Sequence, residues 1–157
     1  MRPVVLLLTL LLPAAARAQS PVLSVRGVSF GLSVADMAAS TKWYVEKLGL
    51  HVTMQLPRND ATRASVTLLQ GGGLTVELVH DEDAVPLGRL LPANKGAISV
   101  HGIAKVGVTV DDFDRALAAL RARGVDIAYG PFPKRTDQPA NVIIRDNAGN
   151  LIQISAR

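Results

Sequence analysis

Two charged residues, Glu77 and Lys105, lie in segments of alternating polarity where acid–base or anion-binding chemistry could take place. A carboxylate can act as a general base, and a lysine can act as an amine nucleophile or bind a carboxylate or enolate-like oxygen. Both fall on the polar side of a predicted strand. They are therefore the candidate catalytic residues, and the alternative is an ion pair that takes no part in catalysis.

The three histidines do not form a pattern typical of a metal site. His80 follows Glu77 by three positions, so the two side chains point to opposite faces of a continuous strand. His101 precedes Lys105 by two pleats, and His51 comes directly after the first predicted helix. We expect all three to be surface or rim residues.

An internal repeat organises the chain. Residues 29–36 match residues 105–112 at an offset of 76 (105 − 29), and residues 64–78 match 140–154 at the same offset. The repeat places Glu77 over Gln153. Two separated blocks that share one offset predict two copies of one structural unit.

Each half is predicted to form a strand, a helix and three further strands, which indicates the α+β class. Asp36 and Asp112 occupy N-cap positions of the two helices, and Gly49 and Gly124 follow their last turns. The expected strands are 28–34, 51–56, 62–69, 74–79, 106–110, 125–129, 141–145 and 151–155. The expected segments are a signal peptide at 1–18, one domain at 19–157, a first module at about 25–80, a linker at about 81–97 and a second module at about 98–157.

Two stretches carry a family resemblance. "VSFGLSVADMAASTKWYVEKLGLHV" resembles the opening strand and helix of the vicinal oxygen chelate family (glyoxalase/bleomycin resistance/dioxygenase), and "RDNAGNLIQI" resembles its closing hairpin. The resemblance covers nearly all of residues 19–157. It implies two βαβββ modules in tandem, whose curled mixed sheets surround a cavity.

The resemblance also implies four metal-ligand positions, and this chain fills them poorly. They correspond to Ser29, Glu77, Lys105 and Gln153, of which only Glu77 is a usual ligand. Lysine is normally cationic, so it cannot ligate a cation and would repel it. We therefore predict no metal and no other cofactor, with a divalent metal as the alternative that a metal assay would decide.

Strand parity defines a polar concave surface opposite the helices, which we interpret as a ligand cavity. The alternative is a solvated outer face. Phe132 lies in a proline-rich loop that either overhangs the cavity mouth or is an ordinary surface loop. The predicted cavity residues are Ser29, Gly31, Ser33, Thr75, Glu77, Lys105, Gly107, Thr109 and Gln153.

The first 18 residues have the layout of a secretory signal peptide. Arg2 precedes an aliphatic run, and Ala16-Arg17-Ala18 offers a cleavage site before Gln19. The run is short for a membrane span, which needs about 20 residues, and the chain has no cysteine to carry a lipoprotein anchor. We expect export to the periplasm or the cell exterior, with an uncleaved anchor as the alternative.

Composition narrows the partners. The net charge of +4 falls to +2 (4 − 2) without Arg2 and Arg17, and no basic cluster with interleaved aromatics occurs, so nucleic acid is not an expected partner. Once the signal is removed, no membrane contact is expected. The leading hypothesis is a small-molecule binding protein that uses no metal. A homodimer is compatible with this hypothesis. One alternative is a lyase, isomerase or dioxygenase-like enzyme with a rearranged site around Glu77, and another is a degenerate domain that binds a partner protein.

Overall fold

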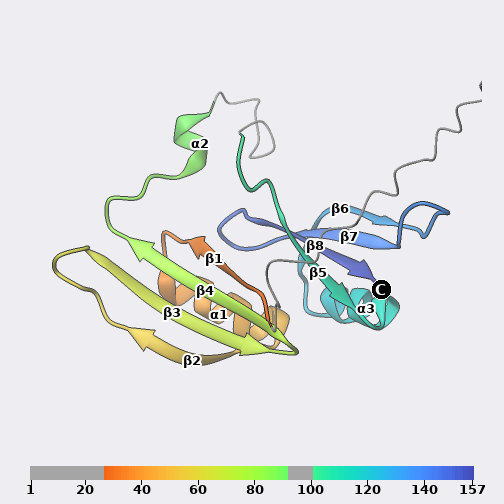
Figure 1. Ribbon diagram of the computed structural model, residues 1–157, viewed down its shortest axis with the longest axis horizontal. Helices are drawn as coiled ribbons and strands as arrows, with labels where there is room; N and C mark the ends of the chain where they lie inside the picture. The colour runs from red at the N-terminus through yellow and green to blue at the C-terminus, as the bar shows by residue number, and fades with distance from the viewer. Residues whose placement is uncertain (1–26, 92–100) are drawn as a thin grey trace, which may run out of the picture.

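The computed structural model describes residues 27–91 and 101–157 (Figure 1). Two four-stranded mixed sheets, in the orders β1-β4-β3-β2 and β5-β8-β7-β6, confirm the α+β fold of two βαβββ modules. The sheets remain separate and do not close on one another. The elements are β1 (Ser29–Ser33), α1 (Met37–Trp43), the π-helical turn η1 (Tyr44–Leu48), β2 (His51–Leu56), β3 (Ala64–Gly71), β4 (Leu74–Asp81), α2 (Leu87–Leu90), β5 (Val106–Val110), α3 (Phe113–Ala122), β6 (Asp126–Phe132), β7 (Asn141–Arg145) and β8 (Leu151–Ala156).

Two sequence predictions concern residues beyond these ranges. The predicted signal peptide at 1–18 and most of the second half of the predicted linker lie outside the described residues. Within the ranges 27–91 and 101–157, no helix is long and apolar enough to span a bilayer.

Both helix boundaries follow the local sequence. The side chains of Asp36 and Asp112 accept hydrogen bonds from the backbone N–H of Ala39 and Arg115, each at 2.9 Å, as the N-cap prediction required. Gly49, with φ of 75°, adopts the left-handed conformation that ends a helix without steric cost. The last turn before it is π-helical rather than the regular α-helix expected.

Strand pairing fixes which side chains share a face. In the parallel pair β1–β4 Gly31 lies beside Glu77, and in the parallel pair β5–β8 Gly107 lies beside Gln153. Paired residues point to the same side of a sheet. The register therefore agrees with the polar face expected from alternation, and it leaves the apolar residues on the helix side.

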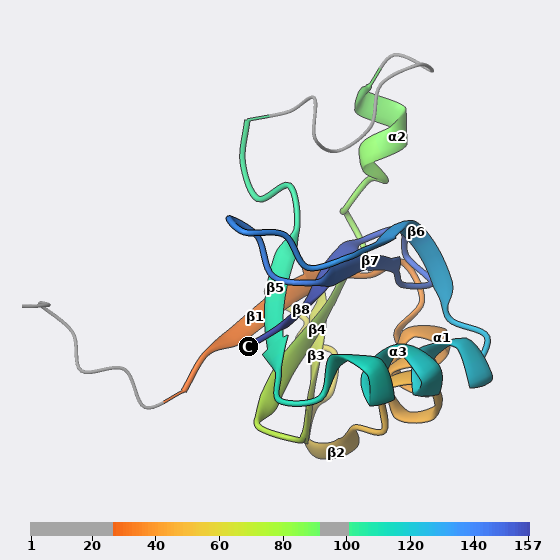
Figure 2. The same ribbon diagram turned by 90° about the vertical axis from the view of Figure 1, so that its right-hand side faces the viewer.

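The apolar residues of both modules form one core between the sheets and the helices α1 and α3. Both helices lie on the same side of the two sheets (Figure 2). Tyr44 is fully buried in this core. The buried apolar residues are Val34, Tyr44, Leu50, Leu69, Val76, Leu78, Leu117, Leu120, Val125, Val142, Ile144, Ile152 and Ile154.

Polar contacts connect the helix of the first module to the β7–β8 turn and to the end of α3 in the second module. The hydroxyl of Tyr44 donates to Oδ2 of Asp146 at 2.8 Å, within a buried setting. Lys47 Nζ donates to the carbonyl of Arg123, and Arg123 Nη1 donates back to the carbonyl of Lys47 at 3.0 Å. The side chain of Asn147 also donates to Oγ of Ser40 at 3.1 Å. We refer to this set as the inter-module joint.

Candidate functional site

The second module carries a hollow of about 370 Å³ on the sheet face opposite α3. Sites for small molecules span roughly 300–1,000 Å³, so this volume suits a small ligand. We call it the second-module hollow. It is lined by Lys105, Phe132, Arg135, Gln138, Asn141, Ile143 and Gln153.

Two neighbouring strands form the floor of the second-module hollow. Ile143 on β7 lies beside Gln153 on β8, and Asn141 lies two residues along β7 on the same face. Lys105 directly precedes β5, which pairs with β8, so its side chain reaches the same surface. The floor thus combines a cation, two amides and one apolar side chain.

The connection between β6 and β7 forms the wall. Strand β6 continues to Phe132, which pairs with Asn141 and remains 41% exposed, so the ring is accessible from the hollow. Beyond it, the backbone N–H of Arg135 donates to the carbonyl of Gln138 at 2.8 Å, and this bond closes a tight turn. The turn presents both side chains to the hollow.

The polar groups of the lining favour a ligand with negative charge. Lys105 and Arg135 are cations, and no acidic residue lines the hollow. Among the described residues, no carboxylate lies within the 4.0 Å of an ion pair from either one. Asn141 is only 2% exposed, and its Nδ2 donates to the carbonyl of Pro139 at 3.2 Å. This bond holds the amide in place at the hollow.

Two of the nine predicted cavity residues, Lys105 and Gln153, line this hollow. Gly107 and Thr109 lie on strand β5 of the same sheet but outside the lining. The other five belong to the first module, on β1 and β4. They are Ser29, Gly31, Ser33, Thr75 and Glu77.

The structure does not join Glu77 and Lys105 as an ion pair within the part of the chain it describes. Glu77 lies beside Gly31 and Leu68 on the face of the first sheet. Its Oε2 would lie 3.4 Å from a Cβ atom at Gly31, so glycine leaves room for this carboxylate. Glu77 is absent from the lining around Lys105.

Four residues of the lining are not among the cavity residues expected from the sequence: Arg135, Gln138, Asn141 and Ile143. A signal for Asn141 and Ile143 was available, since both share strand parity with Gln153 across the closing hairpin. For Arg135 and Gln138 the only signal was the proline-rich loop around Phe132, because a sequence does not reveal how a loop folds over a sheet.

The residues at the family's metal-ligand positions do not fit a metal ion. Of Ser29, Glu77, Lys105 and Gln153, one is a carboxylate and one is a cation. In residues 27–91 and 101–157, no three His, Asp or Glu side chains are grouped so that they could hold a metal ion. His80 is engaged elsewhere, with Nδ1 at 3.0 Å from the carbonyl of Val34.

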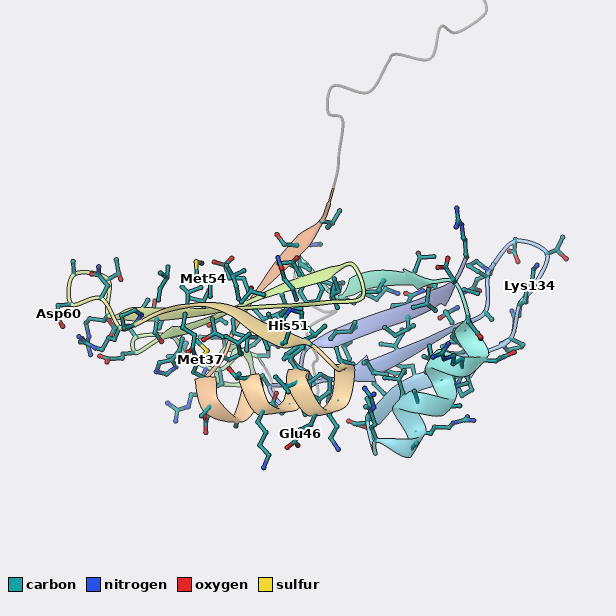
Figure 3. The ribbon with its side chains drawn as sticks, turned by 90° about the horizontal axis from the view of Figure 1, so that it is seen from below. Met37, Glu46, His51, Met54, Asp60 and Lys134 are labelled. Carbon is teal, nitrogen blue, oxygen red and sulfur yellow. The ribbon has the colours of Figure 1, made fainter. Side chains whose placement is uncertain are left out.

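A second hollow, of about 460 Å³, lies on the helix side of the first sheet, between α1, η1 and β2. Figure 3 shows Met37 and Glu46 on this helix side, whereas Met54 points away from α1. Thr41 Oγ1 is buried there without a hydrogen-bond partner. None of the predicted cavity residues belongs to this helix-side hollow, which is lined by Met37, Ala38, Thr41, Lys42, Val45, Glu46 and Gln55.

Comparison with known proteins identifies similar sequences and folds. Residues 27–154 match the family described as the Glyoxalase/Bleomycin resistance protein/Dioxygenase superfamily. None of the curated proteins matches the chain.

Among solved structures, a glyoxalase family protein from Enterococcus faecalis is 15% identical, with a TM-score of 0.65 over 81% of this chain and 94% of that one. TnmS3, an antibiotic binding protein from Streptomyces sp. CB03234, is 22% identical, with a TM-score of 0.57 over 87% of this chain and 98% of that one. The trypanothione-dependent glyoxalase I of Leishmania major is 19% identical, with a TM-score of 0.58 over 85% and 87%. At these identities the likeness shows the fold alone.

Proposed function

The chain belongs to the Glyoxalase/Bleomycin resistance protein/Dioxygenase superfamily, and on this premise we propose that it binds a small organic molecule in the second-module hollow without using a metal ion. One observation carries the proposal. A hollow of about 370 Å³ contains Lys105 and Gln153, the two residues of the second module that occupy metal-ligand positions in the family. A lysine and an amide bind polar ligand groups directly, so no metal is needed to hold a ligand there. The similar fold of an antibiotic binding protein supports binding as a role for this scaffold.

A ligand screen tests this proposal. Residues 19–157 would be screened by thermal shift against a chemically diverse library, because a ligand at 100 times its Kd stabilises a protein by about 2.7 kcal/mol. Hits that bind the second-module hollow should lose most of this stabilisation in Gln153→Ala. Gln55→Ala is the matched control, since it removes the same side chain from the helix-side hollow. Hits that respond only to Gln55→Ala would overturn the assignment.

A metal assay separates binding from the enzymatic alternative around Glu77. The same protein would be dialysed against Mn, Fe, Ni and Zn, and its metal content measured beside that of Glu77→Gln. We expect no retained metal, because only one of the four positions supplies a usual ligand. About one metal per chain, lost in Glu77→Gln, would contradict the proposal and favour metal-dependent catalysis. Absence of both metal and ligand would favour the partner-binding alternative.

We also propose that two copies of the chain associate through the first module. Met54 and Leu56 are 41% and 50% exposed on strand β2, whose outer edge pairs with no described strand. Apolar side chains along a sheet edge favour association with another chain. Light scattering of residues 19–157 should give twice the monomer mass, and Leu56→Glu should halve it. Leu90→Glu, at another exposed leucine in α2, is the control, and an equal effect of both changes would refute this interface.

Export is the remaining part of the proposed function, and its support is the N-terminal sequence. The three-part pattern of residues 1–18 predicts cleavage before Gln19. N-terminal sequencing of the protein from fractionated cells should find Gln19 outside the cytoplasm. An intact Met1 in the membrane fraction would favour the uncleaved anchor.

A further inference from the structure

We propose that the second-module hollow selects organic anions, specifically small aromatic carboxylates, and that Lys105 and Arg135 together bind the carboxylate group. The inference rests on the proposed function, since it specifies the ligand of the same site. The lining combines two cations, three side-chain amides and two apolar side chains, without an acid.

Lys105 and Arg135 are the two cations of the lining. Arg145, on the same strand as two floor residues, has a counter-charge in Asp126 at 3.4 Å. In the described ranges no carboxylate reaches Lys105 or Arg135 in this way. A ligand carboxylate would supply the countercharge. The planar guanidinium can donate two parallel hydrogen bonds to it, and the lysine can add a third.

The apolar part of the lining indicates what the carboxylate is attached to. Phe132 presents a partly exposed ring at the wall. Ile143 lies on the floor, two residues along β7 from Asn141, which pairs with Phe132. Aromatic rings favour offset-stacked or edge-to-face packing against another ring. A hollow of about 370 Å³ is near the lower end for ligand sites, which favours a body of one or two rings.

The three amides complete the recognition. Gln138, Asn141 and Gln153 each carry a donor and an acceptor, so they can bind a hydroxyl or carbonyl substituent of the ring. Asn141 is held by its bond to Pro139, and Nε2 of Gln153 donates to Oγ of Ser155 at 3.1 Å. Because these bonds fix their orientation, the two amides lose little rotamer freedom when a ligand binds.

A phosphate ester is the competing anion, since two cations suit it equally well. Phosphate sites commonly add backbone N–H groups from a glycine-rich loop or a helix N-terminus. The lining of this hollow contains no glycine and no residue of a helix. The combination of cations with Phe132 and Ile143 therefore favours the carboxylate on an aromatic ring.

The test compares matched probes on residues 19–157. Calorimetry would measure 2-naphthoate, its neutral analogue 2-naphthamide, and inorganic phosphate, while amide NMR shifts of Ile143 and Gln153 locate the binding. We expect 2-naphthoate to bind about tenfold or more tightly than the amide, because hydrogen bonds to charged groups exceed neutral ones by about that factor. Lys105→Gln and Arg135→Gln should each weaken 2-naphthoate about tenfold and change 2-naphthamide by less than about twofold. Arg121→Gln, on helix α3, removes the same charge and should change neither.

Three outcomes would overturn the inference. Equal affinities for naphthoate and naphthamide, unchanged in both variants, would show a hollow that ignores charge while still binding small molecules. Phosphate that displaces naphthoate at equal or lower concentration would assign the hollow to phosphate. No naphthoate-induced shift at Ile143 and Gln153 would refute the carboxylate class, and the proposed function would fail only if the wider library also gave no hit there.

Discussion

Replacing Tyr44 by phenylalanine would remove one hydrogen bond from the inter-module joint without removing the ring that fills the core. The Tyr44 hydroxyl donates to Oδ2 of Asp146 at 2.8 Å, and the two residues are 0% and 5% exposed. A hydrogen bond to a charged group contributes about 1.5–3 kcal/mol to the free energy of unfolding. The Nδ2 of Asn150 still reaches the same oxygen at 2.9 Å, so we expect a loss of about 1.5–2 kcal/mol, in the lower part of that range.

Equilibrium unfolding in urea measures this loss. Trp43, the sole tryptophan, packs edge-on against Tyr44 with ring centroids 4.9 Å apart, so its fluorescence reports on the joint. Circular dichroism would follow the whole fold in parallel. The midpoint should fall while the slope with urea stays constant, because the surface exposed on unfolding is the same.

Tyr129→Phe is the matched control, since this other tyrosine is 53% exposed. Its removal of one hydroxyl should stay within about 0.5 kcal/mol of the unchanged protein. An equally small effect of Tyr44→Phe would refute the reasoning, because it would mean that the buried bond contributes no more than a hydroxyl in water. Asp146→Ala should cost more than Tyr44→Phe, since it also leaves the backbone N–H groups of Ala148 and Asn150 without their acceptor.

Two further predictions concern the pH dependence of stability, and a third concerns a glycine. The pKa of Tyr44 is raised, first by burial and then by the charge and hydrogen bond of the neighbouring carboxylate. The stabilisation that Tyr44 provides should therefore be complete below about pH 10 and decline above it, as the unfolded phenol ionises. Urea midpoints from pH 8 to 11 should show this decline, and Tyr44→Phe should lessen it. The hydrogen bond from Arg58 leads the contacts that lower the pKa of Glu82 from 4.5 to about 2, so its small stabilising contribution should be present above pH 4.5 and disappear toward pH 2; carboxyl NMR titration would follow this, and a Glu82 midpoint near 4.5 would contradict it. Gly49→Ala should cost about 1 kcal/mol in urea unfolding because φ is 75° there, whereas Gly88→Ala, which would contact nothing within 4 Å, should cost less; equal costs would show that the left-handed helix end is not what requires glycine.

Local and periodic features of the fold could be predicted from the sequence. Asp36 and Asp112 predict the starts of their helices, because an N-cap depends on three or four consecutive residues. The pairing of Gly31 with Glu77 agrees with the alternation of the two strands, since side-chain direction in a strand has a period of two. Because the repeat gives both halves the same pattern, the same inferences apply to the second module.

Features that depend on contacts between distant residues could not be predicted. Nothing near Tyr44 in the sequence indicates a bond to Asp146, which lies 102 residues away. The extension of β6 to Phe132 and the presence of Arg135 in the same lining as Lys105 depend on how one loop crosses a sheet. Strand parity predicted one cavity lined by residues of both sheets, whereas the hollow is lined by residues of the second module only.

The reciprocal bonds of Lys47 and Arg123 have an evolutionary consequence. The two residues lie at the ends of the two helices, two positions before Gly49 and one position before Gly124, and each donates to the main-chain carbonyl of the other. Two identical copies of a single module, related by a two-fold axis, would bring the same two helix ends together. An unduplicated ancestral gene could therefore have built the joint from separate polypeptides. Fusion of two gene copies would then have replaced dilution-sensitive assembly by an effective local concentration of about millimolar, which freed the two halves to diverge.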